Sequence, residues 1–167
     1  YAHAHHNLGI IFKEFKDYQN AKTCYEKAIE IDPNYVNAHY NLGNVFVTLG
    51  ENQKAKSCYE KVIRINPNYT LAYNNLGIIF VASKDYQKAK ECYEKIIAIK
   101  PDYADAHNNL GNVYNKLGEN QKAKEFYEKA IEINPNYADA YNNLGSIFKV
   151  LEKNQKAKEC YNKAIEI

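Results

Sequence analysis

The sequence predicts an all-α solenoid of five helix pairs, and three observations carry this prediction. A Leu-Gly pair recurs every 34 residues, with its glycine at Gly9, Gly43, Gly77, Gly111 and Gly145. A proline recurs at the same interval, at Pro33, Pro67, Pro101 and Pro135. Within a repeat, apolar residues are spaced three or four apart, which marks one face of a helix. A fixed period of this length is typical of arrays in which each repeat buries its apolar face against its neighbours.

The repeats follow one another without a linker or a low-complexity segment. We expect a single array over residues 1–167, with repeats at approximately 2–35, 36–69, 70–103, 104–137 and 138–167. The array stops in mid-phase at Ile167, and the sequence contains no Met. We therefore expect an excerpt of a longer array, a processed chain or a designed one.

The fourth repeat illustrates the elements that all five share. Its first helix is predicted from about 104 to 117, because Ala106, Leu110, Val113 and Leu117 form one apolar stripe. Gly118 suits a left-handed cap at the end of that helix. The second helix is predicted from about 121 to 133, and a proline at 135 ends it.

Composition narrows the class of function. Charged residues make up 25% of the chain and the formal net charge is +2, which is too mild to indicate nucleic acid or an anionic membrane as partner. No apolar run approaches the ~18 residues that span a bilayer, and no signal peptide is visible. The four cysteines lie at Cys24, Cys58, Cys92 and Cys160, without a CxxC pair. We expect a cytoplasmic or nuclear protein that is not an enzyme and uses no cofactor or metal.

The repeat motif resembles that of the tetratricopeptide repeat family over the whole chain. In the fourth repeat the matching residues are Leu110, Gly111, Tyr114, Ala123, Tyr127, Ala130 and Pro135. The sequence departs from the family where His or Tyr replaces the common Trp, and where Lys16, Lys84 and Glu152 replace the turn glycine. The resemblance implies a right-handed superhelix that acts as an intracellular protein-interaction module. It also implies that ligands bind the concave face, which the first helices line.

Asparagines are concentrated on the predicted ligand-binding side of the first helices. One column is Asn in every repeat, at Asn7, Asn41, Asn75, Asn109 and Asn143, and a partial second row adds Asn44 and Asn112. Tyr40, Asn74, Asn108, Asn142 and Ile78 complete the candidate peptide-binding face. Because an amide both donates and accepts, such a ladder can pair with the backbone of an extended protein or peptide segment. The ladder resembles that of the tetratricopeptide region of O-linked N-acetylglucosamine transferases.

Other interpretations stay open. The asparagines could reflect a compositional bias, or they could bridge adjacent helices, and the chain could be a spacer that associates end to end without a groove ligand. Some family members bind acidic chaperone tails through a basic clamp, but Tyr40, Asp105 and Asn109 occupy the basic positions here. We therefore predict no chaperone-tail binding.

Two further features have simple interpretations. His3 and His6 could share an adventitious metal ion. Alternating Lys and Glu on the second helices, such as Glu125 with Lys129, indicate a solvated face held by i, i+4 ion pairs rather than a stripe for RNA.

Overall fold

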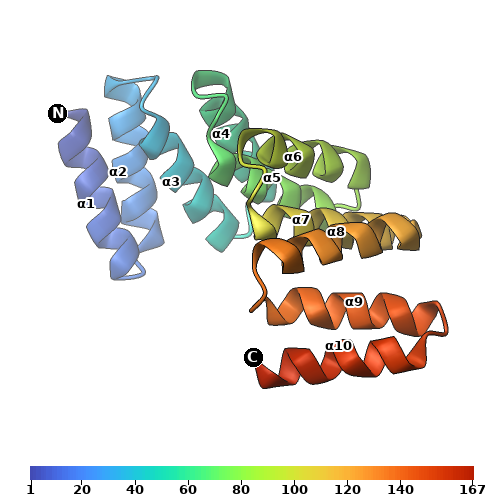
Figure 1. Cartoon of the computed structure of the whole chain (residues 1–167). Helices are drawn as coiled ribbons and strands as arrows, with labels where there is room; N and C mark the ends of the chain where they lie inside the picture. Colours follow the sequence, from blue (N-terminus) through green and yellow to red (C-terminus); the bar gives the residue numbers. More distant parts are fainter. The chain divides into compact units, whose positions relative to one another are not determined.

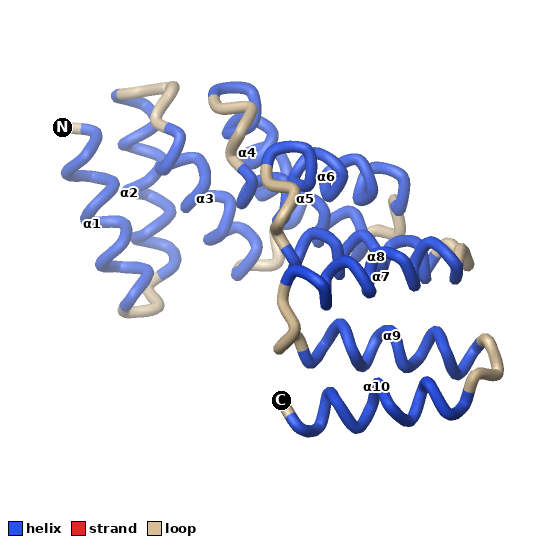
Figure 2. The backbone as a smooth tube through the Cα atoms, viewed as in Figure 1, coloured by secondary structure: helices blue, strands red, loops and turns tan.

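The computed structural model describes residues 1–167 and is entirely helical (Figures 1 and 2). Its ten helices are α1 (Ala2–Glu14), α2 (Tyr18–Ile31), α3 (Val36–Thr48), α4 (Asn52–Ile65), α5 (Thr70–Ala82), α6 (Tyr86–Ile99), α7 (Ala104–Lys116), α8 (Asn120–Ile133), α9 (Ala138–Val150) and α10 (Asn154–Glu166). The all-α prediction is confirmed, and the expected bounds of α7 and α8 differ from the observed ones by a single residue. The periodicity of three and four therefore located the helices correctly.

The chain divides into two compact units, Tyr1–Ile79 and Phe80–Ile167, and the division falls within α5. In the first unit α1 packs on α2, α3 packs on α4, and α2 packs on α3. The second unit repeats this pattern, with α7 on α8, α9 on α10, and α8 on α9. Each helix pair thus buries its apolar face partly against its own partner helix and partly against the next pair.

The Leu-Gly motif has a steric cause. A Cβ atom placed on Gly43 would lie 2.7 Å from Cε1 of Tyr59, a ring of the second helix of the same repeat. The same relation joins Gly9 to Tyr25, Gly111 to Tyr127 and Gly145 to Tyr161. Tyr25, Tyr59 and Tyr127 are fully buried. The glycine is therefore required because the tyrosine ring fills the space that a side chain would occupy.

The turn between the two helices of a repeat keeps one backbone conformation whatever residue occupies it. Gly50 and Gly118 have φ angles of 76° and 78°, and Lys16, Lys84 and Glu152 adopt 61°, 60° and 59°. A left-handed conformation costs a non-glycine residue ~1–2 kcal/mol. Tertiary packing of the two helices therefore dictates the turn.

Histidine takes a structural role at the slot where the family commonly has Trp. Nε2 of His39 donates to the carbonyl of Pro33 over 3.0 Å, and Nε2 of His107 donates to the carbonyl of Pro101 over 2.7 Å. Each bond ties a first helix to the proline turn that precedes it. The replacement of Trp thus keeps a ring in the slot and adds a hydrogen bond to the turn.

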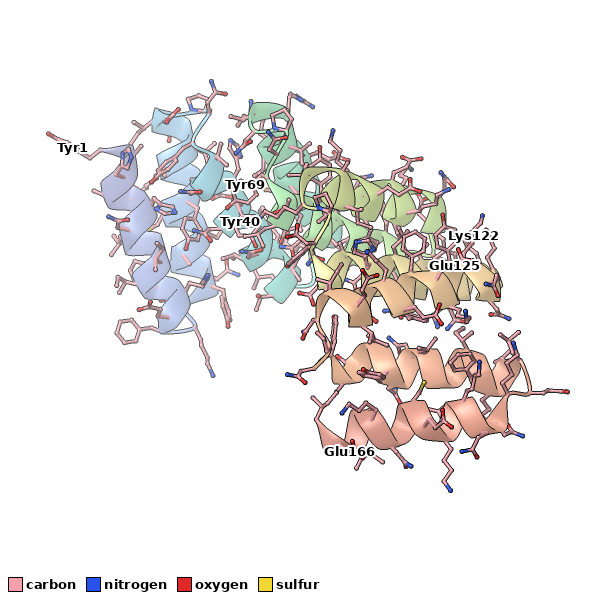
Figure 3. All side chains as sticks on the ribbon, viewed as in Figure 1. Tyr1, Tyr40, Tyr69, Lys122, Glu125 and Glu166 are labelled. Carbon is pink, nitrogen blue, oxygen red and sulfur yellow. The ribbon has the colours of Figure 1, made fainter.

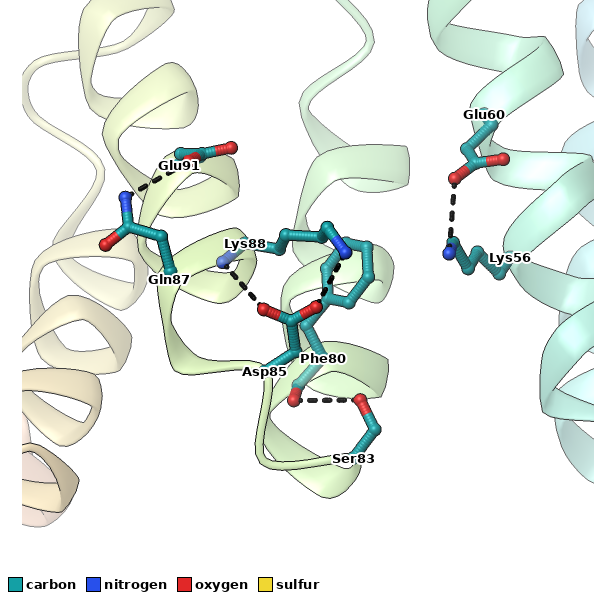
Figure 4. A network of polar contacts seen from close by, with 8 residues as sticks. All are labelled: Lys56, Glu60, Phe80, Ser83, Asp85, Gln87, Lys88 and Glu91. Atoms are coloured by element: carbon teal, nitrogen blue, oxygen red, sulfur yellow. Dashed lines mark hydrogen bonds and ion pairs between the residues drawn. The ribbon is translucent and has the colours of Figure 1, made fainter.

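The second helices carry the expected charged face, but the pairing prediction was wrong in detail. The Glu125 carboxylate accepts from Nε2 of Gln121, and Lys129 pairs with Glu132 instead. Gln87 and Glu91 repeat the first arrangement in α6, and the i, i+4 pair Lys56–Glu60 runs along α4 (Figure 4). Figure 4 also shows the Asp85 carboxylate accepting from the backbone N–H of Lys88, which caps the start of α6.

Candidate peptide-binding site

The predicted asparagine column lies along the first helices, and its members are only partly exposed. Asn41, Asn75, Asn109 and Asn143 are half-buried, whereas Asn7 on α1 is exposed. Of the neighbouring candidates, Asn108 is buried, Asn74 is half-buried, and Asn142 and Ile78 are exposed. The half-burial indicates that the column contacts other helices as well as solvent.

Two members of the column, Asn75 and Asn143, belong to two equivalent hydrogen-bonded clusters, called here the amide triads. In the first triad the hydroxyl of Tyr59 donates to Oδ1 of Asn44 over 2.7 Å, and Nδ2 of Asn75 donates to the same oxygen over 3.0 Å. The second triad contains Tyr127, Asn112 and Asn143, with distances of 2.8 and 3.2 Å. Each triad joins both helices of one repeat to the first helix of the next.

The triads fix which way the carboxamides point. Because Oδ1 of Asn44 accepts from two donors and Nδ2 of Asn75 donates to Asn44 and to the Tyr40 hydroxyl, the orientation of both amide groups is determined by their partners. The Nδ2 group of Asn44 and the Oδ1 atom of Asn75 make no hydrogen bond within the protein. The first triad therefore presents one donor group and one acceptor side by side, in orientations that are set before any ligand arrives.

The other candidate residues make similar contacts between helices. Nδ2 of Asn143 also donates to Oδ1 of the buried Asn108 over 3.0 Å. Tyr40 and Tyr69 lie close together (Figure 3), with their ring centroids 5.2 Å apart. The Tyr40 ring also contacts the Tyr59 ring, at a centroid distance of 5.9 Å. Asn75 approaches the Tyr40 hydroxyl at 3.5 Å. The bridging interpretation that the sequence left open therefore describes a real part of what these asparagines do.

The first repeat shows what happens when a triad is incomplete. Ile10 stands at the position equivalent to Asn44, and the buried hydroxyl of Tyr25 has no hydrogen-bond partner. Burial raises the pKa of Tyr25 to about 12.

His6 of the first repeat contacts the asparagine column of the second. Its Nε2 atom lies 2.9 Å from Nδ2 of Asn41, and burial lowers the pKa of His6. A neutral imidazole that accepts from Asn41 is therefore the favoured form.

A cavity of about 270 Å³ opens beside the first amide triad. Its lining consists of the triad members Asn44, Tyr59 and Asn75 together with three aliphatic residues, Val47, Ile78 and Ile79. Val47 and Ile78 are 43% and 53% exposed. Sequence reasoning selected Ile78 but missed Val47 and Ile79, although Val47 follows Asn44 by three residues and so lies on the same face of α3.

Three of the four cysteines are buried, and the fourth is half-buried. All four cysteines are free thiols, and burial raises the pKa of Cys58 to about 11, which disfavours the thiolate. The structure contains no group of three or more His, Cys, Asp or Glu side chains that could hold a metal ion. None of its helices combines the length and the apolar character needed to cross a bilayer.

The comparisons with known proteins agree with this architecture. One tetratricopeptide repeat model matches residues 36–69, 104–137 and 138–167. A second, described as TPR repeat, matches 9–50 and 78–118, and a third, also a tetratricopeptide repeat, matches 58–91. The chain therefore belongs to the tetratricopeptide repeat family. No curated protein sequence matches it.

Several solved structures share the fold. MamA is 30% identical, with 95% of this chain and 92% of that chain covered and a TM-score of 0.88. YrrB, described as a TPR protein with an unusual peptide-binding site, is 25% identical over 97% of this chain and 84% of its own, with a TM-score of 0.80. MamA from Desulfovibrio magneticus RS-1 is 23% identical over 99% and 93%, with a TM-score of 0.90, and supports the fold alone.

Proposed function

We propose that this chain is a non-catalytic protein-interaction module that binds an extended peptide along the face lined by its first helices. The observation that carries the proposal is the pair of amide triads, each of which holds carboxamides in a fixed orientation with unpaired polar atoms. A peptide backbone supplies the complementary N–H and C=O groups. The peptide-binding site attributed to YrrB supports this class of partner for a chain of the same fold. The lack of disulfides fits an intracellular location.

Recognition of the peptide backbone limits the binding affinity that we expect. Each hydrogen bond contributes only ~0.5–1.5 kcal/mol net, and association carries its own entropy cost. We therefore expect affinities of roughly micromolar or weaker from the amides alone. Sequence selectivity must come from side chains that contact the surface between the amides.

A lysate pull-down tests the proposal. The intact chain is compared with the Asn41→Ala, Asn75→Ala, Asn109→Ala triple variant, which we expect to lose the partners. A matched control is the Asn52→Ala, Asn120→Ala, Asn154→Ala variant, which removes the same number of amides from the start of the second helices. Circular dichroism and thermal melting of all three are essential, because Asn41 and Asn75 also bridge helices. Equal capture by the two folded variants would move recognition to another face.

A second candidate, end-to-end self-association, has its own observation. Leu8 on α1 is 45% exposed, whereas its equivalent Leu42 is 6% exposed because a preceding repeat covers it. At the other end Ile165 is 81% exposed, beside a cavity of about 470 Å³ lined by residues of α9 and α10 that include Tyr161 and Ala164. A second copy of the chain could bury both surfaces. Sedimentation velocity tests this candidate: dimers that grow with concentration and vanish in Ile165→Asp support it, and a monomer at all concentrations rejects it.

A further inference from the structure

We propose that the cavity beside the first amide triad is a specificity pocket for one aliphatic side chain of the bound peptide. We further propose that the equivalent place in the second compact unit accepts a small or polar side chain instead. This inference rests on the proposed function and adds to it the class of ligand residue that each place selects.

The shape and lining of the cavity fit a single side chain. Its volume of about 270 Å³ lies just below the ~300–1,000 Å³ typical of small-molecule sites. Val47, Ile78 and Ile79 form an aliphatic wall, and the buried Tyr59 also lines the cavity. An aliphatic group that covers Val47 and Ile78 removes from water apolar surface that the free protein leaves exposed.

The polar side of the cavity positions a peptide above this wall. The free Nδ2 group of Asn44 can donate to a peptide carbonyl, and the free Oδ1 of Asn75 can accept from a peptide N–H. In an extended peptide, successive side chains point to opposite sides of the backbone. A residue whose backbone is held by the two amides therefore directs its own side chain, or that of its neighbour, into the cavity.

The second compact unit supplies an internal comparison. Sixty-eight residues further along the chain, the triad recurs as Asn112, Tyr127 and Asn143, but Asn115 replaces Val47 and Ser146 replaces Ile78. The Ser146 hydroxyl donates to the carbonyl of Asn142 over 3.1 Å and lies 3.3 Å from the Tyr161 hydroxyl. The two sites thus keep the same asparagines, whose amides would bind the peptide backbone. They differ in the aliphatic wall, which would select the side chain of the peptide.

Random twelve-residue peptides displayed on phage provide the test. They are selected against the wild-type chain and against Val47→Asn/Ile78→Ser, which gives the first place the residues of the second. The reverse variant, Asn115→Val/Ser146→Ile, builds the aliphatic wall at the second place. Val47, Ile78 and Asn115 are exposed and Ser146 is half-buried, and thermal melting checks that each variant is folded.

We expect wild-type selections to share a Leu, Ile or Val, and replacement of that residue by Ser to weaken binding about 10- to 150-fold, the equivalent of burying one aliphatic side chain. The same replacement should have little effect on binding to Val47→Asn/Ile78→Ser. The reverse variant should select a second aliphatic residue.

Two results would contradict the proposal in distinguishable ways. Peptides that bind the wild type, fail to bind the asparagine triple variant and show no aliphatic preference would overturn the specificity pocket and leave the proposed function standing. Selections that return no binding peptide, or only peptides indifferent to the asparagine triple variant, would overturn both.

Discussion

Asn75 on α5 donates from Nδ2 to Oδ1 of Asn44 on α3, 3.0 Å away, and so links two consecutive repeats through their side-chain amides. The Tyr59 hydroxyl donates to the same oxygen over 2.7 Å. Asn44 and Asn75 thus each use one polar atom of the carboxamide to bridge helices and leave the other polar atom without a partner in the protein. Stability and recognition are therefore coupled at these positions, and each can be measured separately.

The first prediction concerns the shared acceptor. Asn44→Ala leaves the Tyr59 hydroxyl and Nδ2 of Asn75 without their partner, and we expect a loss of ~1–3 kcal/mol in the free energy of unfolding. Asn37→Ala is the matched control, since Asn37 is exposed on the same helix and should change stability by less than ~0.5 kcal/mol. Urea denaturation measures both values. Equal stabilities for the two variants would show that the triad contributes nothing to folding.

The tyrosine column offers an internally controlled experiment. Tyr59→Phe removes a hydroxyl that is hydrogen-bonded, whereas Tyr25→Phe removes one that is buried without a partner. We expect Tyr59→Phe to cost ~0.5–1.5 kcal/mol and Tyr25→Phe to be neutral or stabilising. Ile10→Asn, which supplies the missing acceptor, should raise the melting temperature. An opposite ranking of the two phenylalanine variants would refute the assignment of Tyr25 as unpaired.

The Leu-Gly motif can be tested by adding one methyl group. In Gly43→Ala the new Cβ atom would meet the Tyr59 ring at 2.7 Å, and we expect a destabilisation of ~1–3 kcal/mol from overpacking. Combining Gly43→Ala with Tyr59→Leu should recover part of that loss, because the smaller side chain vacates the space. If the double variant is destabilised by the sum of the single effects, the contact is not the cause.

Buried tyrosines predict a loss of stability at alkaline pH. Burial raises the pKa of Tyr25 and Tyr127 to about 12, above the ordinary value of 10.0. The folded state then holds protons that the unfolded state releases, so stability is fully present below pH 10 and falls as the pH rises from 10 toward 12. Denaturant titrations across this range, with tyrosinate absorbance as a second probe, should show the decline. Constant stability up to pH 12 would show that the burial of these tyrosines does not couple their titration to folding.

Some of these features follow from the sequence and others do not. The helices, the proline turns and the asparagine face are set by local periodicity, which repeats five times with little variation. The bridging hydrogen bonds depend on the register between neighbouring repeats, which single-repeat patterns do not specify. Val47 and Ile79 were missed because a cavity is defined by side chains from two repeats at once.

The incorrect ion pair has a similar origin. The i, i+4 rule identified Glu125 and Lys129 as neighbours, but Gln121 lies one turn earlier on the same face and donates to Glu125. Lys129 pairs instead with Glu132, three residues onward. Each such surface pair stabilises a helix by only ~0.2–0.5 kcal/mol, so the spacing of the residues alone does not determine which pair forms.

A nuclear magnetic resonance titration tests directly whether the first-helix face binds peptide through its oriented amides. A peptide enriched in the phage selection is added to the isotope-labelled 167-residue chain, and the side-chain amide signals of Asn44 and Asn75 are followed. We expect these signals to shift together with backbone signals of α3 and α5. Shifts confined to the second helices α4 and α6, with both amides unchanged, would contradict it.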